Sequence, residues 1–211
     1  MPLIYQHSIN SSTRIGLWQI EEPESFFATP HLQAPPTLHP QRRLQYLSAR
    51  HLLTQLYADF PVHAVQVSQA GKPFLPCGSY DFSMSHAANY AASIVSSNER
   101  VGIDAEIASP RIFKVQHKFM HADEMVLLDS LTALLPQQTL LTLCWSVKEA
   151  LFKWYGFGQV NFQEHLRITH IDGNAQEGNV SAFVAKEGGI ALSLSYGLFD
   201  PLVLCWVASD R

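Results

Sequence analysis

The order of helical and strand patterns limits the fold of this chain more than any other feature. Apolar residues recur at helical spacing over about residues 41–58 in the first half, and over about 122–135 and 138–155 in the second. Short strand patterns bounded by turn residues occur at 3–9, 13–20, 64–69, 80–85, 90–97, 101–108, 165–170, 180–186, 190–197 and 202–209. A long helix followed by strands therefore occurs twice, which predicts an α+β fold.

The repetition of this order predicts a pseudo-twofold arrangement of two similar halves, each a small, mainly antiparallel sheet packed with a long helix. The halves meet near residue 100, so we expect an N-terminal half over residues 1–100 and a C-terminal half over residues 101–211. The 211 residues are 47% hydrophobic, which is enough to form a substantial core.

Charge and cysteine content exclude several classes of protein. Charged residues make up 15% of the chain and the net charge is −4, so overall charge indicates neither nucleic acid nor an anionic membrane as a partner. The N-terminal residues lack a basic region followed by an apolar core, and no apolar run approaches the length of a membrane span. Cys77, Cys144 and Cys205 form no CxxC pair, so neither a disulfide framework nor a thiolate zinc site is indicated. We expect a soluble cytoplasmic protein.

The strand pattern "VGIDAEIA" at residues 101–108 brings two acids together. Strand alternation places Asp104 and Glu106 on one face with Gly102, and the apolar side chains on the other face. Two strand rises separate the acidic Cα atoms by roughly 7 Å, so both carboxylates can reach one cation. Mg²⁺ is typically held by one or two carboxylates together with phosphate and water. For this stretch alone, an exposed edge strand with two solvated acids is the commoner explanation.

The helical pattern "WSVKEALFKWYGFG" at residues 145–158 is unusually apolar for a helix with three charges. Glu149 and Lys153 are spaced i and i+4, which in an ordinary surface helix gives a weak ion pair. Trp145 and Phe152 flank these charges, and a carboxylate against aromatic surface is costly unless a cation or hydrogen bonds compensate it. Glu149 is therefore expected to have a cation or hydrogen-bond donors as partners.

Taken together, "VGIDAE" and "WSVKEALFK", which begins 41 residues after Asp104, resemble the two signature motifs of the 4'-phosphopantetheinyl transferases. The length and the two-half organisation look like the monomeric surfactin-synthetase-activating type rather than the shorter trimeric type. Three further segments are similar to family patterns, namely "RRLQYLSARHLL" at 42–53, "GKPFL" at 71–75 and "FSMSH" at 82–86.

This resemblance implies transfer of the phosphopantetheine arm of coenzyme A to a serine of an apo carrier protein, with release of 3',5'-ADP. Coenzyme A is then a substrate, and Mg²⁺, with Mn²⁺ as a substitute, is the implied metal. Asp104, Glu106 and Glu149 would be its ligands, and Lys153 would reach a phosphate or the leaving group. Glu124 matches an acidic residue between the motifs, so it would be the general base or orient a water, although stabilisation of a helix start is a common alternative.

The resemblance also implies which residues bind coenzyme A. The expected phosphate-binding residues are Arg43, Arg50, Lys72, Ser85 and His86. Arg43 lies two helical turns before Arg50, so both could face the 3'-phosphate, although exposed helix arginines are far commoner than phosphate clamps. Lys148 is left open between a structural ion pair and a second phosphate contact.

The carrier proteins of such enzymes are typically acidic around the modified serine. If residues 110–121 are helical, Arg111, Lys114 and Lys118 form one basic stripe. The adjacent stripe is apolar and consists of Ile112, Val115 and Phe119. We expect the carrier to dock on these stripes, and we expect a monomer that binds neither nucleic acid nor a membrane.

Two alternatives belong to other classes of protein. His117 and His121 have the i, i+4 spacing of a helical Zn²⁺ site, which would suit a metal-dependent phosphoester hydrolase. A catalytically silent carrier-binding protein is also conceivable, but the presence of all three carboxylates disfavours it. The sequence does not identify the carrier, which could come from fatty acid, polyketide, peptide or lysine-related metabolism.

Overall fold

The computed structural model describes residues 3–186 and 188–211, which form two compact units. The first unit contains the chain up to Val101 together with Ala208–Arg211, and the second is Gly102–Val207. The chain passes from one unit to the other within one strand and returns within the last strand. In the described parts of the chain, no helix combines the length and apolar character needed to span a membrane.

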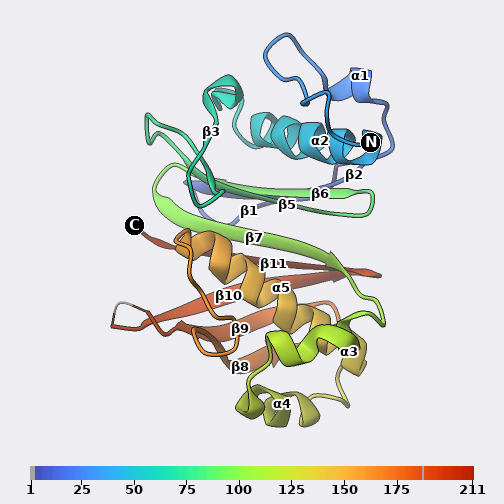
Figure 1. Ribbon diagram of the computed structural model, residues 1–211, viewed down its shortest axis with the longest axis vertical. Coiled ribbons are helices and arrows are strands. Elements are labelled where there is room, and N and C mark those ends of the chain that lie inside the picture. Colours follow the sequence, from blue (N-terminus) through green and yellow to red (C-terminus); the bar gives the residue numbers. More distant parts are fainter. Residues whose placement is uncertain (1–2, 187) are drawn as a thin grey trace. The chain divides into compact units, whose positions relative to one another are not determined.

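The first unit is a four-stranded antiparallel sheet covered by one long helix (Figure 1). The strands, in their order across the sheet, are β1 (Leu3–Ser8), β2 (Thr13–Gln19), β6 (Tyr90–Ser96) and β5 (Asp81–Ala87). The helix α2 (Pro40–Leu56) begins at a proline, as helices often do, and packs on β2, β5 and β6. Its leucines at 47, 52, 53 and 56 are buried in an apolar core that belongs to this unit.

Shorter elements complete the first unit. They are α1 (Glu24–Phe27), a 3-10 helix (Val62–Ala64), and the hairpin of β3 (Gln66–Val67) and β4 (Pro73–Phe74). The strand predicted at 64–69 is therefore only two residues long, because its first residues form the 3-10 turn that follows Pro61.

The second unit is a five-stranded sheet with its own core and its own long helix (Figure 1). The strands, in order, are β7 (Glu99–Ile107), β11 (Leu202–Asp210), β10 (Ile190–Phe199), β9 (Glu177–Val184) and β8 (Leu166–Gly173). The pairs from β8 to β11 are antiparallel. Helix α5 (Gln137–Tyr155) ends at Gly156 in the left-handed conformation, with φ of 73°. The predicted α+β fold class is confirmed.

The remaining helices of the second unit differ from their predicted extents. Helix α4 (Ala122–Asp129) was expected to continue to residue 135, but turns replace it after Asp129. The backbone N–H groups of Leu131 and Leu134 bond to carbonyl oxygens three residues back, those of Leu128 and Leu131, so single turns follow the helix. Residues 110–121 form only the single turn α3 (Ile112–Val115) and a 3-10 helix (Gln116–Lys118).

Candidate active site

Helix α5 lies against the polar face of β7, and a glycine makes this close approach possible. A Cβ atom at Gly102 would lie 2.2 Å from the carbonyl oxygen of Ala150 and 2.8 Å from the backbone nitrogen of Trp154. Any larger residue would push the helix away from the strand. The glycine in "VGIDAE" therefore brings the side chains of α5 within hydrogen-bond reach of the carboxylates that follow it.

Asp104 is the most enclosed of these carboxylates. Its side chain is only 3% exposed, so it is not the solvated acid of an edge strand. Its two oxygens accept hydrogen bonds from α5: Oδ2 from Ser146 Oγ at 2.8 Å, and Oδ1 from Lys153 Nζ at 2.7 Å. Two bonds to one helix fix the orientation of this carboxylate.

Glu106 and Glu149 complete a group of three neighbouring acids. The indole Nε1 of Trp145 donates to Glu106 Oε1 at 3.1 Å. Burial, and then the negative charge of Asp104, raise the pKa of Glu106. The same two causes raise the pKa of Glu149 from 4.5 to about 7, and Lys153 only partly offsets them. For Glu106 and Glu149, burial and repulsion between the carboxylates thus outweigh the attraction of Lys153, so a further positive charge would stabilise the ionised cluster.

This donor set fits a hard divalent cation chemically, because carboxylate oxygens are the ligands that Mg²⁺ prefers and a cation would supply the missing charge. The three side chains do not form a finished cage. Among the described residues, no group of three or more His, Cys, Asp or Glu side chains has the arrangement needed to hold a metal ion. Lys153 Nζ contacts Asp104 Oδ1 directly, so a cation approaching that oxygen would have to replace the ammonium.

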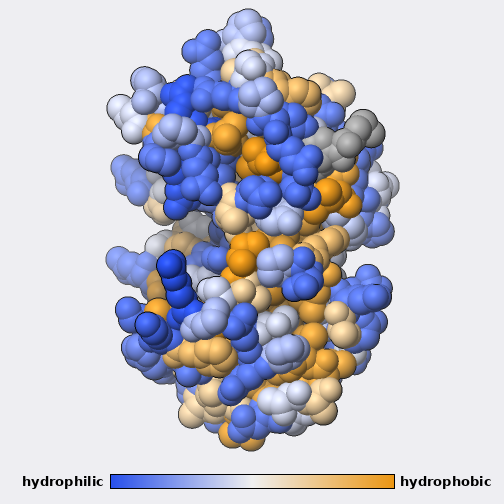
Figure 2. All heavy atoms as spheres, turned by 90° about the vertical axis from the view of Figure 1, so that its right-hand side faces the viewer, coloured by the Kyte–Doolittle hydropathy of each residue, from blue (hydrophilic) through white to orange (hydrophobic). Residues whose placement is uncertain are grey.

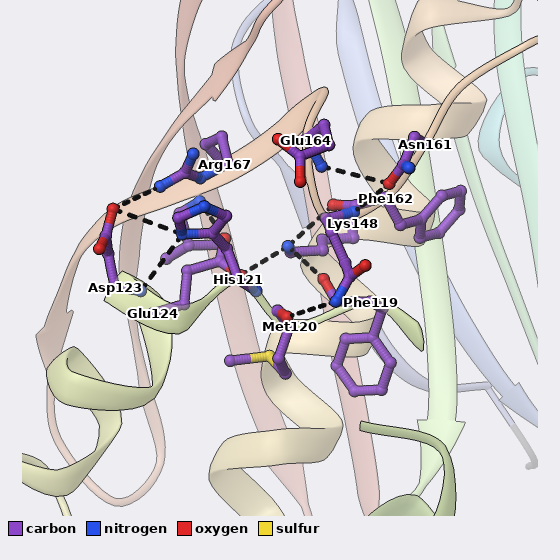
Figure 3. Close-up of polar contacts among 12 residues, drawn as sticks. Phe119, Met120, His121, Asp123, Glu124, Lys148, Asn161, Phe162, Glu164 and Arg167 are labelled. Atoms are coloured by element: carbon purple, nitrogen blue, oxygen red, sulfur yellow. Dashed lines mark hydrogen bonds and ion pairs between the residues drawn. The ribbon is translucent and has the colours of Figure 1, made fainter. Parts of the chain in front are cut away.

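The structure departs from the sequence interpretation at Glu124 and Lys148, which face each other in the interior (Figure 3). Lys148 is completely buried, and its Nζ lies 2.6 Å from Glu124 Oε2. The ammonium also donates to the carbonyl oxygens of Phe119 at 2.6 Å and Phe162 at 2.9 Å. All three of its protons are used, so Lys148 is the structural partner of Glu124 and has no donor left for a phosphate.

Both carboxylate oxygens of Glu124 accept hydrogen bonds in the interior. Its side chain is 1% exposed, Oε2 also accepts from the backbone N–H of His121 at 2.7 Å, and Oε1 accepts from that of Ile168 at 2.7 Å. His121 Nδ1 in turn accepts from the backbone N–H of Asp123 at 3.2 Å, so a histidine caps α4 where Ser or Thr is usual. These bonds join the start of α4 to β8 and α5, which favours the alternative of a helix-start residue; the role of general base stays a prediction.

A sequence signal for this buried pair exists. Lys148 lies on one helical stripe with Leu141, Cys144, Leu151 and Tyr155, all of which are buried. A lysine on such a stripe requires a buried acceptor. Of the two possibilities left open for Lys148, its buried contacts favour the structural ion pair.

The zinc alternative finds no support in the positions of its two histidines. His117 belongs to the 3-10 helix and His121 precedes α4, so they do not share a helix and the i, i+4 argument does not apply. His121 Nδ1 is already the cap of α4.

The two arginines of α2 that were predicted to bind coenzyme A differ in their partners. Arg43 is ion-paired with Glu24 through two hydrogen bonds, and its contact with a 3'-phosphate stays a prediction. Arg50, by contrast, is half-buried; its guanidinium lies 3.5 Å from the centre of the Tyr46 ring and donates weakly to the Tyr46 carbonyl. Burial lowers the pKa of Arg50, and none of the described residues forms an ion pair with it.

The remaining predicted ligands lie on β5 and in the β3–β4 hairpin. Ser85 is buried and His86 is exposed because neighbouring residues of a strand face opposite sides of the sheet, so these two do not point to one ligand. Arg42, which sequence reasoning missed, lies 3.3 Å from His86. Lys72 lies 3.8 Å from Asp81, and burial lowers the pKa of Lys72.

A protein-family comparison identifies the chain. The model of the 4'-phosphopantetheinyl transferase superfamily matches residues 100–205, half of the 211 residues, and the match includes Asp104, Glu106, Glu149 and Lys153. The chain belongs to this superfamily. No curated protein matches it significantly.

Proposed function

We propose that this protein is a phosphopantetheinyl transferase of the surfactin-synthetase-activating type. It would transfer the 4'-phosphopantetheine arm of coenzyme A to a serine of an apo acyl or peptidyl carrier protein and release 3',5'-ADP. Membership of the superfamily supports phosphopantetheinyl transfer in general. The observation that carries the proposal is the cluster of Asp104, Glu106 and Glu149 around one lysine, in which the pKa of Glu149 is raised to about 7.

In this proposal Asp104, Glu106 and Glu149 hold Mg²⁺, for which Mn²⁺ could substitute. The ion would neutralise the pyrophosphate of coenzyme A and stabilise charge on the oxygens of the breaking bond. The physical support for this assignment is that burial and mutual repulsion raise the pKa values of Glu106 and Glu149, a cost that a bound cation would offset.

Two residues of α5 would act on the reacting groups. Glu149 would take the proton of the carrier serine while the serine oxygen attacks the phosphorus that bears the pantetheine arm. The bond from this phosphorus to the anhydride oxygen breaks, and 3',5'-ADP leaves. Lys153 would turn from Asp104 to donate a hydrogen bond to the leaving phosphate. Glu149 thus takes over the basic role that the resemblance implied for Glu124.

Arg50 is the best supported ligand for the 3'-phosphate. Among the described residues, its half-buried guanidinium contacts the Tyr46 ring and donates one weak hydrogen bond, and a phosphate would offer it stronger acceptors. Lys72 and His86 are proposed as further phosphate contacts in the first unit.

The carrier is proposed to dock beside α3. Arg111, Lys114 and Lys118 are exposed there, as the sequence interpretation requires. The predicted apolar stripe needs correction, because the segment is not one helix and Phe119 is buried; the exposed apolar side chains are Phe113 and Val115. Figure 2 shows hydrophobic side chains among hydrophilic ones on this face of the second unit. Basic groups would attract an acidic carrier, and the apolar side chains would fix its position.

The test is to incubate the protein with coenzyme A, Mg²⁺ and an apo carrier and to weigh the carrier by mass spectrometry. We expect the carrier to gain one phosphopantetheine group. Asp104→Ala, Glu106→Ala and Glu149→Ala should each abolish this gain in a folded protein, whereas Glu164→Ala, which removes an exposed acid of the same unit, should not. Turnover close to wild type in any two of the three variants would exclude the three-carboxylate site.

A further inference from the structure

A serine hydroxyl is buried in the middle of α5 beside the most enclosed carboxylate of the cluster. Ser146 is 0% exposed, and its Oγ donates to Asp104 Oδ2 at 2.8 Å. Neither the sequence interpretation nor the family comparison assigns a role to this residue. Burial of a hydroxyl lowers the stability of a fold unless the hydroxyl is hydrogen-bonded, so the partner that it takes is informative.

Other hydroxyls in the helices of this protein behave differently. On α5 itself, one turn earlier, the buried Thr142 donates to the carbonyl oxygen of Gln138 at 2.8 Å. On α2, Ser48 donates in the same way to the carbonyl of Leu44 at 2.7 Å. This bond to the preceding turn is the usual arrangement for a hydroxyl inside a helix. A hydroxyl has one proton to donate, and Ser146 gives its proton to Asp104.

The adjacent residue makes the matching contact. Trp145 donates to Glu106, and its ring is fixed by stacking on Phe162, with 5.5 Å between ring centres, and by an edge contact with Phe119 at 5.1 Å. Consecutive residues of α5 therefore hold the two alternate acids of β7. Gly102 permits this register, because it lets the helix backbone approach the strand.

We propose that Ser146 is a positioning residue for Asp104. Its hydrogen bond fixes Oδ2 and thereby the plane of the carboxylate, so that Oδ1, the oxygen that Lys153 contacts, is the one presented to a cation. This inference depends on the proposed function, because it takes Asp104 as a metal ligand. Partners that orient a ligand typically contribute about 10-fold to 100-fold to metal affinity.

The test measures Mn²⁺ binding to the full chain without coenzyme A or carrier, by the electron paramagnetic resonance signal of free Mn²⁺. Ser146→Ala should weaken binding by about 10-fold to 100-fold, while Ser146→Thr, which keeps the hydroxyl, should restore most of it. Thr142→Val is the matched control, because it removes a buried hydroxyl from the same helix that bonds only to backbone. It should bind Mn²⁺ like wild type.

Activity provides a second readout. Ser146→Ala should require more Mg²⁺ for half-maximal transfer but recover most of its kcat at saturating Mg²⁺, since the ligands themselves remain. Wild-type Mn²⁺ affinity in a folded Ser146→Ala protein would overturn the positioning role, as would equal weakening in Thr142→Val. If Asp104→Ala also binds Mn²⁺ like wild type, the metal site of the proposed function fails, and the two failures can be told apart.

Discussion

Replacement of Glu149 by glutamine should stabilise the metal-free protein while it removes activity. The pKa of Glu149 is raised from 4.5 to about 7, so the folded protein binds a proton more tightly than the unfolded chain does. Wild-type stability therefore falls as pH rises from 4.5 to about 7 and stays reduced above that range. The full shift corresponds to about 3 kcal/mol. Because the side chain is only partly buried, solvent screening reduces this cost, and we expect a gain of about 1–2 kcal/mol from Glu149→Gln at pH 8.

The assay is urea unfolding in the presence of EDTA, followed by tryptophan fluorescence, to which Trp145, Trp154 and Trp206 of the second unit and Trp18 of the first unit contribute. The stability difference between Glu149→Gln and wild type should be small at pH 5 and largest at pH 8. Mg²⁺ should then stabilise wild type more than the variant, because only wild type has the third carboxylate. Glu164→Gln serves as the exposed control. A Glu149→Gln protein that is less stable than wild type at pH 8 would refute the reasoning, since it would mean that the surroundings favour the charged carboxylate.

Three further predictions concern binding and packing. Lys148→Met should lower the free energy of unfolding by about 3–5 kcal/mol, because it leaves Glu124 buried without its cation. The folded fraction should keep its KM for coenzyme A. A raised KM would instead support a phosphate contact. Arg50→Ala, Lys72→Ala and His86→Ala should mainly raise KM for coenzyme A, because they bind a part of the substrate remote from the breaking bond; a lower kcat with unchanged KM would make them catalytic. The KM for the carrier should rise several-fold at high salt, and also in the double variant Arg111→Glu and Lys114→Glu, with little effect on coenzyme A binding. If neither change alters the KM for the carrier, the carrier docks on another surface.

Local patterns in the sequence were sufficient for the long elements. The helix expected at about 41–58 is Pro40–Leu56, and the helix expected at about 138–155 is Gln137–Tyr155. Their apolar spacing extends over several turns, so the helical period is unambiguous. The strand Glu99–Ile107 with its two acids was likewise predicted, because alternation and turn residues are local properties. Short elements such as α3, and the end of α4, were not predicted because single turns form them, and single turns have no extended apolar period.

The sequence by itself determined the family motifs and the identity of the acids and bases that the site could use. Only the tertiary structure decided which of them face one another. Asp104 meets Ser146 and Lys153, whereas Glu124 meets Lys148 in the interior, although both carboxylates had been assigned to the same site. The physical reason is that the environment of an ionisable group depends on partners dozens of residues away, and on whether water or a buried donor satisfies it. A motif specifies the donor and the acceptor, but packing of α5 on β7 and α4 selects the pairs that form.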